Sequence, residues 1–126
     1  MKHNEWMLSE DQLLEWLKTL IDADNKVVAP AIEDGVKLFR PLKSPEEVVI
    51  EPSGKTRWSP KEFLFPRTET LYRYDLSGSM VQLQNPDGPD RPQVLFGVRS
   101  CDASGLVRLD EIFLSGTRDP LYAARR

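Results

Sequence analysis

The chain has very few of the side chains that build metal sites, since Cys101 is its one cysteine and His3 its one histidine. A single cysteine excludes an internal disulfide and is typical of a protein in a reducing cytoplasm, where we expect this one. A four-iron cluster takes about four thiolates, and a structural zinc ion takes about four Cys or His ligands. We therefore expect no metal, cluster or other cofactor in this chain alone.

Long apolar runs are also missing, and none approaches the roughly 20 residues that a membrane span needs. The N-terminal residues lack the apolar segment of a secretory signal. A net charge of −3 provides no basic surface, so neither nucleic acid nor an anionic membrane is an expected partner. Nucleotide-binding, zinc-protease and esterase motifs are absent as well. The chain itself is not expected to be catalytic.

What remains is an ordinary globular composition, with 40% hydrophobic and 29% charged residues over 126 positions. This favours one small domain spanning residues 1–126, of the α+β or mixed α/β class. Ser9 and Gln12 form a capping-box pattern ahead of an amphipathic stretch, which predicts an N-terminal helix ending within residues 22–25. Two β-rich runs, 26–32 and 36–40, flank Asp34-Gly35 and predict a β-hairpin. Pro30 predicts that its strand lies at a sheet edge or carries a bulge.

Further strands are expected at residues 80–84 and 93–98. The second of these leads into a strand, loop and helix unit near the C-terminus. The polar loop is Arg99-Ser100-Cys101-Asp102, and Asp102 is expected to cap a helix beginning at Ala103. Gly97 predicts a close backbone approach or a bulge at the strand end. A helix start offers unpaired N–H groups and a partial positive charge, so this loop suits a ligating or reactive group. The tail 119–126 looks too short for another element.

Three segments of the chain together resemble a known family. Residues 58–71 read Trp-Ser-Pro-Lys-Glu-Phe-Leu-Phe-Pro-Arg-Thr-Glu-Thr-Leu, residues 94–102 read Val-Leu-Phe-Gly-Val-Arg-Ser-Cys-Asp, and residues 119–126 read Asp-Pro-Leu-Tyr-Ala-Ala-Arg-Arg. In this order and spacing they are similar to the N-terminal part of a family of iron–sulfur electron-transfer proteins. The family is typified by the beta subunit of sulfhydrogenase and the corresponding iron–sulfur subunit of anaerobic sulfite reductase. One departure is Ser100, where the family has a proline before the cysteine.

The resemblance implies an accessory domain of a longer cytoplasmic subunit in a hydrogenase-like or sulfite-reductase-like complex, which as a whole would be an oxidoreductase. In that family the chain continues past the Arg-Arg pair into a ferredoxin-like module that carries 4Fe-4S clusters. This module and redox partner subunits are then the expected partners. The face that meets the module would be uncovered in the chain alone, and we expect it to favour a homodimer.

The function of Cys101 has several interpretations. It is a buried small hydrophobe, a cluster ligand or cluster neighbour beside Arg99 and Asp102, or a reactive thiolate favoured by Arg99 and the helix start. A catalytic nucleophile is less favoured because His3, the one candidate base among histidines, lies at the terminus. The alternatives to an electron-transfer role are a thiol redox sensor or thiol-dependent enzyme using Cys101, and a protein–protein docking module without redox chemistry. Arg67 and Glu69, directly after Pro66, are the candidate interface residues.

Overall fold

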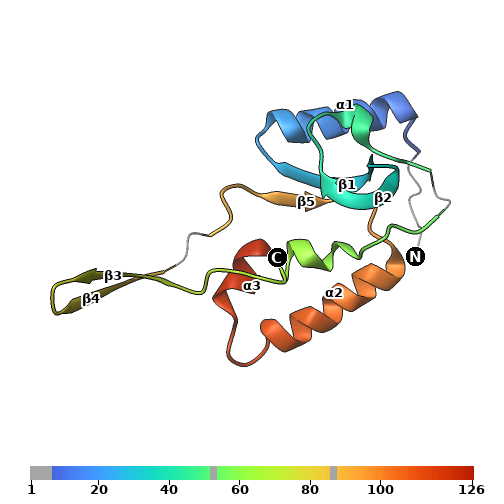
Figure 1. Ribbon diagram of the computed structural model, residues 1–126. Coiled ribbons are helices and arrows are strands. Elements are labelled where there is room, and N and C mark those ends of the chain that lie inside the picture. Colours follow the sequence, from blue (N-terminus) through green and yellow to red (C-terminus); the bar gives the residue numbers. More distant parts are fainter. Residues whose placement is uncertain (1–6, 52–53, 86–87) are drawn as a thin grey trace. The chain divides into compact units, whose positions relative to one another are not determined.

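A computed structural model of the chain describes residues 7–51, 54–85 and 88–126 (Figure 1). It is a small α+β chain, as the sequence predicts. Its elements in order are α1 (Glu10–Asp22), β1 (Lys26–Glu33), β2 (Val36–Pro41), the 3₁₀ turns η1 (Pro45–Glu47) and η2 (Pro60–Phe63), β3 (Arg73–Ser77), β4 (Met80–Gln84), β5 (Gln93–Leu95), α2 (Ser100–Phe113) and α3 (Pro120–Arg125). His3 lies outside the described residues.

The chain divides into two compact units. The first comprises the chain up to Trp58 together with Arg91–Val98, and the second comprises Ser59–Asp90 together with Arg99–Arg126. The first unit holds α1 and the sheet of β1, β2 and β5, whereas the second holds α2, α3 and the β3–β4 pair. The assignment of residues 1–126 to one accessory domain stays a prediction.

Helix α1 begins at the predicted cap. The Ser9 hydroxyl accepts a hydrogen bond from the Gln12 N–H at 3.2 Å, and Gln12 Oε1 accepts one from the Ser9 N–H at 2.9 Å. The reciprocal pair satisfies two N–H groups that a helix start leaves open, which confirms the capping box. From this start the helix places Leu17 in the core of the first unit, where it is fully buried. Its neighbours in that core are Val27, Ala29, Ala31 and Leu42.

The predicted hairpin is also confirmed. Strands β1 and β2 pair antiparallel with Glu33 opposite Val36, and the turn residues Asp34 and Gly35 have φ angles of 49° and 75°. Two consecutive positive φ angles are the signature of a type I′ turn, whose twist matches that of the strands. The third strand, β5, pairs parallel to β1 only over Lys26–Val28. Parallel pairing needs a long connection, which the rest of the chain supplies.

The prediction that Pro30 marks an edge strand is wrong, because β1 lies at the centre of the order β2-β1-β5. The Pro30 carbonyl accepts from the Val49 N–H at 2.8 Å rather than from β2. The backbone nitrogen of Pro30, which has no hydrogen to donate, therefore faces away from β2. On that side the short β5 has already ended at Leu95, so no strand there needs a donor from Pro30. Gly97 occupies this side, and a Cβ on it would lie 3.0 Å from Pro30 Cδ at a φ of +71°. The predicted close approach at Gly97 is thus confirmed.

In the second unit, aromatic rings join three segments. The rings of Phe65 and Phe113 stack with centroids 4.9 Å apart, and Phe113 lies 5.1 Å from Tyr122. Tyr122 belongs to α3, so the prediction that the tail forms no element is wrong. Asp119 caps this short helix by accepting from the Tyr122 N–H at 2.8 Å. The cap and the burial of Tyr122 stabilise a helix that would be too short to persist alone.

Candidate functional site

The polar segment around Cys101 is helical rather than a loop. Helix α2 begins at Ser100, and Arg99 is its N-cap residue, with φ −76° and ψ 156°. The Arg99 carbonyl accepts the Ala103 N–H at 2.8 Å, which closes the first turn. Cys101 lies in that turn and its side chain is exposed. The interpretation of Cys101 as a buried packing residue is therefore wrong, whereas its roles as a cluster ligand or a reactive thiol stay predictions.

Asp102 is not the cap of α2, which corrects the predicted helix start. It lies within the first turn, and its carboxylate Oδ1 accepts a hydrogen bond from the Ser59 hydroxyl at 2.7 Å. A negative charge is favourable there because the backbone N–H groups of a helix start carry partial positive charge. Ser59 in turn accepts from the Lys61 N–H at 3.5 Å and so caps η2. One hydroxyl thus links the start of η2 to the helical turn that holds Cys101.

The residues around Cys101 do not complete a metal site. In the described ranges, no three Cys, His, Asp or Glu side chains lie close enough together to hold a metal ion. A 4Fe-4S cluster takes about four ligands, and Cys101 offers one thiolate. Cys101 could therefore serve as one ligand of a cluster only if the other ligands came from outside the described residues.

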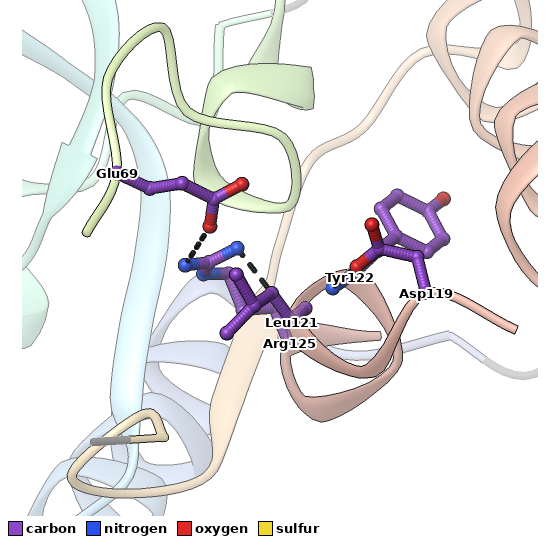
Figure 2. A network of polar contacts seen from close by, with 5 residues as sticks. All are labelled: Glu69, Asp119, Leu121, Tyr122 and Arg125. Carbon is purple, nitrogen blue, oxygen red and sulfur yellow. Dashed lines mark hydrogen bonds and ion pairs between the residues drawn. The ribbon is translucent and has the colours of Figure 1, made fainter. Parts of the chain in front are cut away.

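A second polar network joins α3 to the segment after Pro66 (Figure 2). Arg125 Nη2 donates to Glu69 Oε2 at 2.6 Å, and Nη1 donates to the Leu121 carbonyl at 3.4 Å. Both side chains of the ion pair are mostly buried, with 22% and 20% of their surface exposed. Both side chains line a shallow cleft of about 270 Å³ within the second unit. Glu69 is thus engaged inside its own unit, and the interface role of Arg67 and Glu69 stays a prediction.

A third network fixes the chain end to α2. Asp110 Oδ1 accepts from the Tyr122 hydroxyl at 2.7 Å, and its two oxygens accept from Arg126 Nε at 2.7 Å and Nη2 at 2.9 Å. The hydrogen bonds from Arg126 hold the pKa of Asp110 below its ordinary value of 3.8. Burial, reinforced by the bond to Asp110, raises the pKa of Tyr122 to about 12. Asp110 likewise raises the pKa of Arg126.

Sequence reasoning missed this third network. The available signal was Asp119-Pro120, a capping residue followed by a proline at the first helical position. This signal predicts a short helix that carries Tyr122 and the Arg-Arg pair. It does not predict that Asp110, which lies in a different helix, is the hydrogen-bond partner of Tyr122 and Arg126. The three networks connect those parts of the three resemblance segments that lie in the second unit. Residues of segment 59–71 form hydrogen bonds with α2 and α3, and the C-terminal tail forms hydrogen bonds with α2.

Comparison with curated proteins gives one informative similarity. The chain is 30% identical over 101 residues to the sulfhydrogenase 2 subunit beta of Pyrococcus furiosus, which covers 80% of this chain and 28% of that protein. The chain therefore spans less than a third of the length of the relative it matches. No family model and no solved structure matches the chain. The similarity supports the sulfhydrogenase part of the predicted resemblance, whereas the sulfite reductase and iron–sulfur parts stay predictions. Among the described residues, no helix is long and apolar enough to cross a membrane.

Proposed function

We propose that this chain is an accessory region of an electron-transfer subunit in a cytoplasmic hydrogenase-like complex. The observation that carries the proposal is the similarity to a sulfhydrogenase beta subunit over 80% of the chain. In this role the chain performs no catalysis of its own. Its task is to pack against a cluster-bearing, ferredoxin-like module and to present the first turn of α2 to it.

The arrangement of the second unit supports such a role. Cys101 is exposed on the first turn of a 14-residue helix, which fixes the direction of its Cα–Cβ bond. The Ser59–Asp102 bond attaches this turn to η2, and the aromatic stack of Phe65 and Phe113 joins the same segments farther along α2. A bound 4Fe-4S cluster would supply single-electron transfer. Packing that excludes water, and hydrogen bonds near the cluster sulfurs, tune its potential.

The part played by Cys101 is tested by replacing it in the protein as its native cells make it, purified without oxygen. If Cys101 is a ligand, Cys101→Ser should lower the iron and sulfide content by up to one cluster, or about four iron atoms. If it is a neighbour, the iron content stays constant and the EPR spectrum of the reduced cluster shifts.

A matched control is Ser104→Ala, which changes another exposed position on the same helix. It should leave both the iron content and the spectrum unchanged. Identical iron and identical spectra for wild type and Cys101→Ser would remove Cys101 from the cluster environment. A wild-type protein that contains no iron and is bound to no redox subunit would contradict the proposal as a whole.

A further inference from the structure

The β3–β4 pair is a two-stranded ribbon whose strands are exposed along their entire length. Figure 1 shows the two strands paired only with each other, and among the described residues neither pairs with a third strand. An isolated two-stranded ribbon is marginally stable in water unless another layer covers it. Within the second unit, no further layer of described residues covers the ribbon.

Its register separates the side chains into two faces. Tyr74 lies opposite Leu83, and Leu76 lies opposite Val81, so these four apolar side chains share one face. Their exposed fractions lie between 59% and 71%.

The other face is largely polar. It includes Arg73 opposite Gln84 and Asp75 opposite Gln82. Gln84 Nε2 also donates to Asp75 Oδ2 at 3.0 Å across the two strands. The ribbon is thus amphipathic, and no other described part of the second unit covers its apolar face.

We infer that this apolar face packs against the same face of a second copy of the chain, forming a weak, reversible dimer. The inference is independent of the proposed function. The size of the face fits a weak, reversible contact and is too small for a tightly bound partner. At roughly 100 Å² for each of its four side chains, the face offers about 400 Å² per copy, or about 800 Å² in a dimer. Stable complexes bury about 1,200–2,000 Å² in total, and transient ones bury less.

The charge distribution is compatible with a second copy as the occupant. The apolar face carries no charged residue, so two copies meet without like-charge repulsion. On the opposite face the positive charge of Arg73 is offset by the negative charge of Asp75, so this face has no net charge that would attract anionic lipid headgroups.

The order of the side chains makes the face complementary to itself. The larger pair, Tyr74 with Leu83, lies near the open end of the ribbon, and the smaller pair, Leu76 with Val81, lies near its turn. A two-fold axis that lies between the two faces and runs perpendicular to the strands brings the larger pair of one copy onto the smaller pair of the other. The bulky and small side chains then interdigitate, as close packing requires.

Sedimentation equilibrium over a concentration series up to about 1 mM measures this association directly. The wild type should show a monomer–dimer equilibrium with a Kd on the order of 100 μM. Leu83→Lys places a charge on the apolar face and should weaken the dimer at least about tenfold. Its matched control is Gln82→Lys, the same new side chain on the polar face, which should change Kd by less than about threefold.

Because Leu83 and Gln82 are exposed, neither change should unfold the monomer, and far-UV circular dichroism verifies this. If Leu83→Lys does unfold the ribbon, Val81→Thr keeps the branched shape and should still weaken the dimer about threefold or more. A strictly monomeric wild type would overturn the inference. So would a dimer that resists Leu83→Lys, or one that both lysine variants weaken equally. Binding to lipid vesicles or to another protein without self-association would overturn it as well.

Discussion

Replacing Asp110 with alanine removes the acceptor at the centre of the third polar network. Asp110 receives hydrogen bonds from the buried Tyr122 hydroxyl and from two nitrogens of Arg126. The alanine variant leaves the Tyr122 hydroxyl without this acceptor and detaches the chain end from α2. We expect Asp110→Ala to be among the more destabilising single changes in the second unit.

The magnitude follows from the burial of each partner. Losing the acceptor of the buried Tyr122 hydroxyl costs about 1–3 kcal/mol. The Arg126 side chain is 39% exposed, so its ion pair adds only about 0.2–1 kcal/mol. Together the unfolding free energy should fall by about 2–3 kcal/mol, which corresponds to a loss of roughly 10 °C in Tm for a chain of this size.

Urea denaturation followed by far-UV circular dichroism measures the difference. Glu111→Ala is the matched control, since it removes the neighbouring exposed carboxylate and should change stability by less than about 0.5 kcal/mol. Tyr122→Phe should destabilise the wild type but cost much less in the Asp110→Ala background, because the bond it removes is already lost. If Asp110→Ala is as stable as Glu111→Ala, or the two effects add independently, the reasoning is refuted.

The stabilisation by Asp110 should also depend on pH in a defined direction. Its folded-state pKa is lowered from 3.8 by the hydrogen bonds of Arg126. A lowered pKa means that the stabilisation is present above pH 3.8 and is lost as the pH falls through the folded-state value. The difference in unfolding free energy between wild type and Asp110→Ala should therefore shrink below about pH 4. A difference that stays constant across this range would contradict the ion pair.

Two further predictions concern Tyr122 and Gly97. Burial raises the pKa of Tyr122 from 10.0 to about 12, so the contribution of the protonated hydroxyl to stability is complete below pH 10 and is lost as the pH rises through 12. The ultraviolet difference titration between wild type and Tyr122→Phe should therefore have its midpoint near 12. A midpoint near 10 would contradict the burial. Gly97→Ala places a Cβ 3.0 Å from Pro30 Cδ at a φ of +71° and should cost about 1–3 kcal/mol. Gly105→Ala, where a Cβ meets no atom within 4 Å in α2, should be neutral or stabilising, and equal stability of the two variants would refute the close approach.

The parts of the fold set by neighbouring residues were predictable from sequence. The Ser9–Gln12 capping box and the Asp34-Gly35 turn each depend on a few consecutive positions, and the structure confirms both. Pro30 was misjudged because its tolerance in a central strand depends on the length of β5, which ends before it reaches Pro30. The length of β5 depends on tertiary strand pairing, so the residues around Pro30 do not predict it.

The candidate site was predicted less well, since contacts from distant residues decide it. Asp is a better N-cap than Arg by residue preference. The carboxylate of Asp102 is instead engaged by Ser59, and α2 starts earlier. Cysteine is usually buried, yet Cys101 lies on an exposed helical turn. Helix α3 had a local signal in Asp119-Pro120, but its stability depends on the tertiary burial of Tyr122.

The electron-transfer role is tested most directly on the protein isolated from its native cells under anaerobic conditions. The measurement is the iron and sulfide content of the complex recovered with this chain, together with its EPR spectrum before and after reduction. The proposal predicts that the chain is recovered with a redox partner protein and with 4Fe-4S clusters that become paramagnetic on reduction. It would be contradicted by a preparation that is free of iron, silent in the reduced EPR spectrum and without any oxidoreductase partner.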